Sequence, residues 1–195
     1  MPNKGFLLVQ MQPPPAFEEE FNDWYDTDHI PERLAVPGIE TARRFVCLDG
    51  WPRYLALYDL ESLDTLATAA YRRVSGAHYT PWTRRVLSRV RVFRFTGTQH
   101  YPGNAITSDA GRLILLRFRD VGPQDEPALL TGLRETYQGR PETVQIRLLS
   151  TTSEGVGDCF GLVETRAPSA GPPLALGVFG ACAAKLDSIN VYARY

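Results

Sequence analysis

Hydrophobic positions repeat along the chain in two ways, and the two repeats alternate. Apolar runs such as 5–11 and alternating stretches such as 90–95 predict β-strands, and Asp49-Gly50 between two such runs predicts a hairpin turn. Stripes spaced by three and four residues predict helices. The predicted strands are 5–11, 41–48, 53–60, 90–95, 112–119, 144–149, 159–164 and 188–195. The predicted helices are 16–25, a stripe over 63–74 capped by Ser62, a short helix from Thr80-Pro81, 124–137 and 174–184.

The order strand–helix–strand–strand–helix–strand therefore occurs twice, which predicts an α+β protein built from two tandem ferredoxin-like units. Residues 1–97 form the first unit, the Gly-, Ser- and Thr-rich segment 98–111 is a linker, and residues 112–195 form a second, degenerate unit. Both helices of a unit pack on one side of its sheet, so each sheet keeps an uncovered apolar face. We expect the two antiparallel sheets to pack face to face and to enclose a small cavity.

Composition narrows the class of protein. The 195 residues are 44% hydrophobic and 22% charged, with a formal net charge of −1, which favours a globular protein over a nucleic-acid-binding one. No apolar run approaches the length of a membrane span and no leader pattern is present, so we expect a cytoplasmic protein without membrane contact. The cysteines and histidines lack metal-ligand spacing, and no metal or cofactor site is predicted. These residues are Cys47, Cys159, Cys182, His29, His78 and His100.

The stretch from Phe21 to Arg33, FNDWYDTDHIPER, concentrates aromatic and ionisable side chains. Phe21, Tyr25 and His29 share one helical stripe, and Arg33 follows if the helix persists through Pro31, which either ends or restarts it. In such a stripe His29 can act as general base or acid, and Tyr25 can donate a hydrogen bond to a carbonyl or an enolate. This arrangement suits proton abstraction next to a carbonyl group.

Two adjacent carboxylates, Asp26 and Asp28, can orient the imidazole of His29 and raise its basicity. The alternative is structural, because acids and histidines near a helix end commonly bond the last backbone groups, and spacing alone favours this alternative. The matching helix of the second half, 129–142, keeps a tyrosine at Tyr137 but has no match for Asp28-His29. That asymmetry favours a single functional site in the first half.

Further side chains are candidates for substrate binding. Phe21, Trp24 and Arg33 belong to the same stretch, and the cluster HYTPW adds His78, Tyr79 and Trp82 near a predicted helix start. Capping by Thr80 and packing by Trp82 explain that cluster equally well. Phosphate-loop, dinucleotide-binding and serine-hydrolase motifs are absent from the sequence.

Three stretches carry a resemblance to a known family: FEEEFNDWYDTDHIPERLAVPGIETARRF, PRYLALYDLES and TPWTRR. With its W-Y-x-x-x-H-x-P core and LAVPG, the first half resembles the EthD-like branch of the dimeric α/β-barrel superfamily. The second half resembles the superfamily through its element order. The resemblance implies an intrachain dimeric α/β barrel with His29 as the polar group of a cavity and Tyr25 one turn earlier. The missing second histidine departs from a symmetric two-site dimer.

The superfamily includes cofactor-independent polyketide cyclases, muconolactone-type isomerases and cofactor-free monooxygenases, alongside heme-dependent members. The resemblance therefore implies a small cofactor-independent enzyme for acid/base chemistry on a carbonyl-containing or aromatic metabolite, of the isomerase, cyclase, lyase or cofactor-free monooxygenase type. A non-catalytic binding protein and an assembly module remain alternatives, and the assembly module would have no ligand-sized cavity. Heme, with His29 or His78 as axial ligand, and a homodimer of such chains also stay open.

Overall fold

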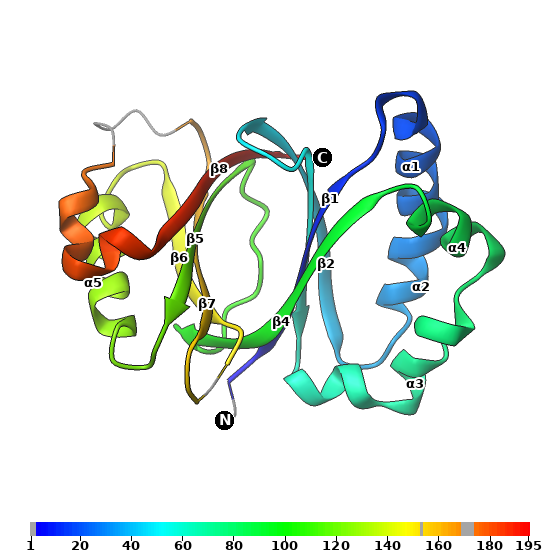
Figure 1. Ribbon diagram of the computed structural model, residues 1–195, viewed down its shortest axis with the longest axis horizontal. Coiled ribbons are helices and arrows are strands. Elements are labelled where there is room, and N and C mark those ends of the chain that lie inside the picture. The colour runs from blue at the N-terminus through cyan, green and yellow to red at the C-terminus, as the bar shows by residue number, and fades with distance from the viewer. Residues whose placement is uncertain (1–2, 153, 169–173) are drawn as a thin grey trace.

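Eight antiparallel strands close into one barrel in the order β1-β3-β2-β8-β5-β7-β6-β4 (Figure 1). The structure is a computed structural model that describes residues 3–152, 154–168 and 174–195. The strands are β1 (Gly5–Gln12), β2 (Ile39–Asp49), β3 (Tyr54–Leu60), β4 (Arg91–Tyr101), β5 (Arg112–Val121), β6 (Thr143–Ser150), β7 (Gly157–Thr165) and β8 (Leu186–Arg194). The predicted α+β class is confirmed, and so are the strand positions, except that β4 continues to Tyr101 instead of ending at residue 95.

Each half of the chain arranges its own four strands alike, as β4-β1-β3-β2 and as β8-β5-β7-β6. The halves are joined edge to edge where β2 pairs with β8 and β4 pairs with β6. Strand β4 runs on to Tyr101, so the first four residues of the segment 98–111 are strand, and Thr98, Gln99 and Tyr101 pair with β6. These pairs are what closes the barrel on that side.

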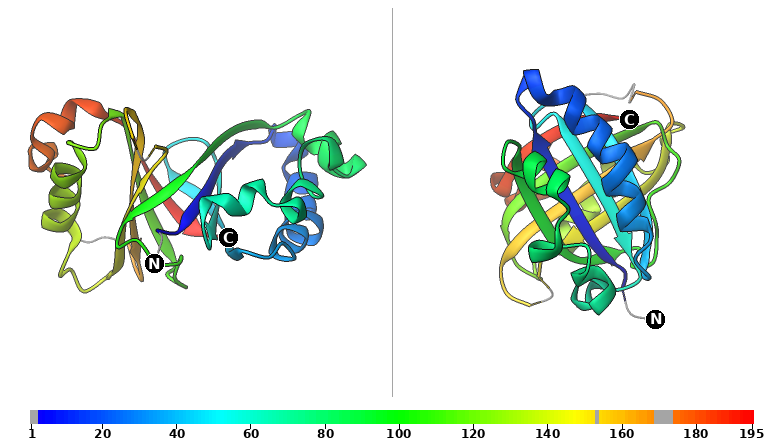
Figure 2. Two further views of the ribbon diagram at one scale, coloured as in Figure 1. Left: turned by 90° about the horizontal axis from the view of Figure 1, so that it is seen from below. Right: turned by 90° about the vertical axis from the view of Figure 1, so that its right-hand side faces the viewer.

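Helices cover the barrel on two opposite sides (Figure 2, left). The first half carries α1 (Glu18–Trp24), the π-helical turn η2 (Tyr25–His29), α2 (Ile30–Leu34), α3 (Ala69–Arg72) and α4 (Pro81–Leu87), with the 3₁₀ turns η1 (Pro15–Phe17), η3 (Leu63–Ala67) and η4 (Gly76–His78). The second half carries α5 (Glu126–Tyr137) and the 3₁₀ segment η5 (Leu176–Lys185). None of the helices in the described ranges has the length and apolarity needed to cross a bilayer.

The first helix continues through Pro31 because the turn before it is wide. The Ile30 N–H bonds the Tyr25 carbonyl five residues back, and Pro31 then stands in the first turn of α2. A proline inside a regular helix crowds the carbonyl four residues earlier and has no N–H for it. A π-turn loosens that spacing. The helix therefore restarts without a break, and Arg33 stays on the face that carries His29.

The helix predicted over 63–74 is wrong in one respect, because it breaks at Thr68. Thr68 has an extended backbone and its hydroxyl accepts from the Tyr71 N–H at 3.2 Å, so it caps α3. Ser62, the predicted cap, makes no such bond. A competing cap in mid-stripe thus starts a new helix, which brings Tyr71 over the sheet.

Side chains fill the interior of the barrel, so the prediction of a cavity between the two sheets is wrong. Alternate residues of β1 point to opposite sides. Phe6 and Leu8 join the interior cluster, whereas Leu7, Val9 and Met11 join the core beneath the helices. The interior cluster comprises Phe6, Leu8, Phe45, Leu55, Leu57, Leu113, Leu115, Leu149, Phe160, Leu162 and Tyr192. Large side chains fill a barrel of eight strands, so the space for a ligand lies outside it.

Candidate functional site

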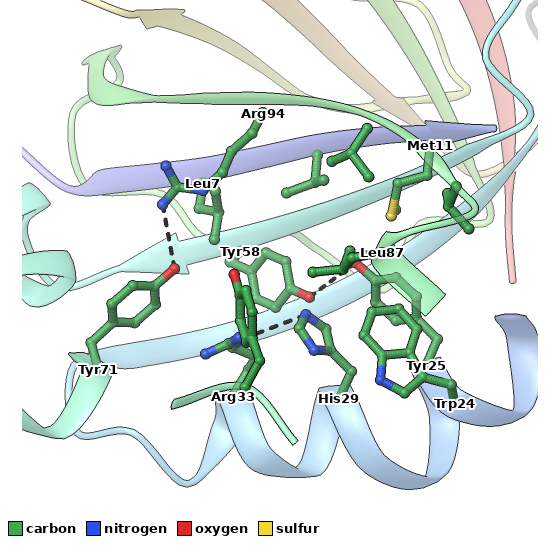
Figure 3. A pocket seen from close by; sticks show the side chains of 14 residues that line it. Leu7, Met11, Trp24, Tyr25, His29, Arg33, Tyr58, Tyr71, Leu87 and Arg94 are labelled. Atoms are coloured by element: carbon green, nitrogen blue, oxygen red, sulfur yellow. Dashed lines mark hydrogen bonds between the residues drawn. The ribbon is translucent and has the colours of Figure 1, made fainter. Parts of the chain in front are cut away.

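A cavity of about 380 Å³ lies between the outer face of the first-half sheet and the helices that cover it (Figure 3). Its volume falls within the range of small-molecule sites, and apolar and aromatic side chains dominate its walls. It is lined by Leu7, Val9, Met11, Trp24, Tyr25, His29, Arg33, Tyr58, Tyr71, Tyr79, Leu87, Val90, Val92 and Arg94.

The first helix contributes four of the predicted site residues to this cavity: Trp24, Tyr25, His29 and Arg33. The ring centroid of His29 lies 4.4 Å from that of Trp24 and 5.1 Å from that of Tyr25. The four-residue spacing of Tyr25, His29 and Arg33 survives the π-turn, so all three reach the same space. This part of the sequence stretch forms a cavity wall as well as a helix.

His29 is a neutral imidazole with one free ring nitrogen. Its Nε2 lies 3.5 Å from the Arg33 Nε–H, which can only donate, so the proton of the neutral ring belongs on Nδ1. Nδ1 is buried and has no hydrogen-bond partner within the described residues. Burial, reinforced by the charges of Arg33 and Arg44, lowers the pKa of His29 to about 3. The side chain is therefore a weak base at neutral pH, and its Nδ1–H is a donor without a partner in the described residues.

Neither predicted orienting carboxylate bonds to His29. Asp26 pairs with Arg44, whose guanidinium stacks over Tyr25 with its central carbon 4.5 Å from the ring centroid. Asp28 accepts from the hydroxyls of Thr80 and Thr83 at 3.4 Å each. Both carboxylates thus tie the helix to its neighbours, and the orientation of His29 comes from Arg33 instead.

Two tyrosine hydroxyls meet at the cavity wall. Tyr25 Oη and Tyr58 Oη are 3.2 Å apart. Burial raises the pKa of Tyr25 to about 12 and that of Tyr58 well above its usual value. Both phenols are protonated at neutral pH, so they can donate hydrogen bonds but cannot accept a proton from a ligand.

The other predicted binding residues divide between the cavity and its surroundings. Tyr79 lines the cavity, with its ring centroid 5.9 Å from the Arg33 guanidinium carbon. Phe21 lies one layer behind, against Tyr25 at 5.4 Å between ring centroids. His78 is exposed, and Trp82 lines a separate surface depression. Thr80 caps α4 as predicted, and the aromatic residues before and after it, Tyr79 and Trp82, line different hollows.

Several lining residues escaped the sequence analysis. Leu7, Val9 and Met11 are ordinary strand residues, and their signal, an apolar run with no polar face, does not say which side meets a ligand. Tyr71 lines the cavity from α3, the short helix that starts after the unpredicted break at Thr68. Arg94 comes from β4 and lines the cavity together with Val90 and Val92, and the sequence pattern did not indicate that an arginine there meets a ligand site.

Comparisons with known proteins place the fold. No family model and no curated protein matches the sequence. Among solved structures, an anthrone oxidase-like protein matches with a TM-score of 0.67 at 11% identity, covering 100% of this chain and 92% of the other. The chain therefore has an α+β fold with a closed antiparallel barrel of eight strands, and its structural neighbours are of the dimeric α/β-barrel type. A heme-binding protein from Thermus thermophilus (TM-score 0.61, 11% identity, 100% and 92% covered) and a mutant chlorite dismutase from Candidatus Nitrospira defluvii (0.59, 10%, 100% and 92%) match it too.

Heme does not fit either of the two histidines, His29 and His78, that the sequence offered as axial ligands. His78 is exposed outside the cavity. His29 has its Nε2 against the Arg33 guanidinium, and its Nδ1 has no partner in the described part of the chain. A metal-ligating histidine normally holds its second nitrogen on a carboxylate or carbonyl, and a neighbouring cation would oppose a ferric iron. The described residues also contain no cluster of three or more His, Cys, Asp or Glu side chains arranged for a metal.

The neutral state of His29 can be tested by pH titration. We expect its imidazole C–H resonances to stay constant from pH 8 to pH 5, because the folded pKa lies near 3. The unfolded chain binds more protons than the folded one between pH 6.5 and 3, so stability falls as the pH drops through that window. The resonances that disappear in His29→Gln belong to His29. The stability of this variant should fall less than that of the wild type between pH 6.5 and pH 3. Titration of His29 near pH 6.5 in the folded protein would contradict the expectation.

Proposed function

We propose that the chain binds a small aromatic molecule with a carbonyl or phenolic oxygen in this cavity. Without a cofactor, it promotes proton transfer at a carbon next to the carbonyl group or conjugated with it. The observation that carries the proposal is the neutral His29, which lines an aromatic cavity and whose buried Nδ1 has no partner in the described residues. A neutral imidazole that donates to the carbonyl oxygen stabilises the enolate that forms when the carbon next to the carbonyl group, or one conjugated with it, loses its proton. The chemistry is of the isomerase or cyclase type, or the first step of a cofactor-free oxygenation.

Within this proposal the roles of the side chains follow from their bonds. His29 donates from Nδ1 to the ligand oxygen, and Arg33 holds the ring in that tautomer through Nε2. Trp24 and Tyr25 fix the imidazole from its sides. The proton leaves to water, because the low pKa of His29 makes the ring itself a poor acceptor. This reverses the general-base role that the sequence suggested and makes His29 an electrophile.

We also infer that the chain is an intrachain pair of ferredoxin-like units and that it belongs near the EthD-like proteins. The identical strand order of the two halves supports the first inference. The second is supported by the W-Y-x-x-x-H-x-P motif, three of whose residues, Trp24, Tyr25 and His29, line the cavity. The anthrone oxidase-like neighbour is consistent with an aromatic ketone as ligand.

The test is hydrogen–deuterium exchange at the acidic carbon of anthrone and α-tetralone in D₂O, followed by NMR. We expect the wild type to exceed buffer, and His29→Leu to lower the protein-dependent rate by about 10²–10³-fold, the usual loss for one oxyanion donor. His29→Gln keeps an N–H donor and should retain part of the rate. His78→Gln, a histidine outside the cavity, should match the wild type. An unchanged rate in His29→Leu would remove His29 from the mechanism.

A non-catalytic binding role is the second candidate. It is favoured by the pKa values of the titratable residues at the cavity wall, about 3 for His29 and about 12 for Tyr25, which leave neither group ready to exchange a proton at pH 7. Under that role the ketones would stabilise the protein against heat without any exchange above buffer, and His29→Leu would weaken binding alone.

A further inference from the structure

We infer that the ligand of this cavity carries a carboxylate, which Arg33 and Arg94 bind at the end of the cavity next to Tyr71. The inference rests on the proposed function in that it places the ligand in the same cavity. It adds the chemical class of the ligand, an aromatic monoanion, and the two residues that select it.

Arg33 is a buried cation whose bonds within the described residues do not satisfy it. Its side chain is 2% exposed, and Nη1 is buried without a hydrogen-bond partner in that part of the chain. Nη2 lies 4.0 Å from a Glu32 carboxylate oxygen, beyond hydrogen-bond distance, and Nε meets His29. A buried charge is costly unless it is paired and hydrogen-bonded. An anionic group on the ligand would supply the missing charge partner and hydrogen-bond acceptor of Arg33.

Aromatic rings hold the Arg33 guanidinium in place. Its central carbon lies 5.3 Å from the ring centroid of Tyr71 and 5.9 Å from that of Tyr79. Stacking covers the faces of a guanidinium and leaves the N–H groups at its edge for planar acceptors. A carboxylate is the acceptor whose two oxygens match that edge.

A second cation reaches the same end from the opposite wall. Arg94 stands on β4 and donates from Nη2 to the Tyr71 hydroxyl at 3.3 Å, so Tyr71 contacts both arginines. Figure 3 shows Arg33, Tyr71 and the Arg94 guanidinium gathered at one end of the cavity. His29 is neutral, so the charges at this end are those of Arg33, Arg94 and Glu32. Their sum is one positive charge, which a ligand with a single negative charge would neutralise.

The other end of the cavity is apolar. Figure 3 places Met11, Trp24 and Tyr25 there, away from the arginines, and Leu87 lies between the two ends. A ligand that satisfies both ends has an aromatic body and one terminal carboxylate. His29 lies between these ends, where it would meet a carbonyl or hydroxyl on the ring.

The experiment compares 2-naphthoate with its neutral isostere 2-naphthamide by calorimetric titration of the full chain. We expect the wild type to bind the carboxylate at least about tenfold more tightly than the amide. Arg33→Met should weaken the binding of naphthoate by at least about 30-fold, because truncating a buried partner of a charge is costly. The affinity for naphthamide should stay within about threefold, because the amide carries no charge. Arg94→Gln, at an exposed position, should weaken naphthoate by about two- to fivefold. Arg72→Gln, an exposed arginine next to Tyr71 and outside the cavity lining, should change neither.

Equal affinity for acid and amide, or no binding of either, would overturn the inference. So would a carboxylate preference that survives both Arg33→Met and Arg94→Gln, and Arg94→Gln keeps the test valid if Arg33→Met fails to fold. The outcome is separable from the proposed function. Carboxylate selectivity without hydrogen–deuterium exchange would uphold the anion site and reject the catalytic role, whereas exchange with no selectivity would do the reverse.

Discussion

Replacing Arg147 by methionine is expected to lower the free energy of unfolding by about 3–5 kcal/mol. Arg147 stands on β6 and is fully buried. It donates to Gln99 at 2.9 Å and Thr107 at 3.0 Å, and it pairs with Asp59 from the first half of the chain. Glu164 lies 3.7 Å away on its other side. The methionine variant leaves two buried carboxylates without their cation, which is the costly way to break a buried ion pair.

Urea unfolding at pH 7 measures this loss. The matched control is Arg119→Met, because Arg119 is 58% exposed and its nearest carboxylate oxygen, on Asp187, is 3.8 Å away. An exposed pair of this kind contributes less than about 1 kcal/mol. If Arg147→Met unfolds within about 1 kcal/mol of the wild type, the network does not hold the two halves together.

The pH dependence of the same variant provides a second check. Burial alone would raise the pKa of Asp59, but Arg147 and hydrogen bonds from Thr41 and Thr107 lower it overall. A lowered folded pKa contributes stability above the unfolded value near 3.8, and that stability is lost as the pH falls through the folded pKa. Without Arg147, burial dominates and Asp59 is best accommodated protonated. We therefore expect the difference between variant and wild type to shrink from pH 7 to pH 4.

The barrel strands could be read from the sequence because their signals are local. Period-two patterns, the Asp49-Gly50 turn and the proline run after β1 each act within a few residues. The inward face of the first helix could be predicted as well, since Tyr25, His29 and Arg33 are spaced four residues apart. Local spacing thus predicted the strands and one wall of the cavity.

The rest depended on contacts between distant residues. The partners of Asp26 and Asp28 are Arg44 and Thr80, 18 and 52 residues away, and the sequence does not show that these partners outcompete a neighbouring histidine. The same holds for the side of β1 on which the cavity opens. A strand that is apolar on both faces fits a packed interior and a ligand site alike.

Gly97, the last residue before the predicted linker, shows how a tertiary contact can be hidden in a stretch that has no strand pattern. Thr96-Gly97-Thr98 resembles loop sequence, yet Gly97 pairs with Phe6 of β1 and lies beside the last residue of β6. A Cβ built at Gly97 would be 1.9 Å from the Ser150 carbonyl oxygen and 2.8 Å from its carbon. The neighbour is backbone, so no side-chain rotation can make room.

Gly97→Ala is therefore expected to destabilise the protein by about 3 kcal/mol, at the upper end of overpacking costs, because β4 must move away from β6 where the barrel closes. Urea unfolding measures the loss of stability. Relative to the wild type, amide hydrogen exchange in the variant should speed up more in β6 than in the paired strands β5 and β7. Gly177→Ala is the control, since its Cβ would meet nothing within 4 Å and its backbone is not left-handed. Its effect should stay within about 0.5 kcal/mol. If both alanine variants are equally stable, the halves can separate at the β4–β6 pairing without cost. The barrel would then be held closed by the Arg147 network and the β2–β8 pairing.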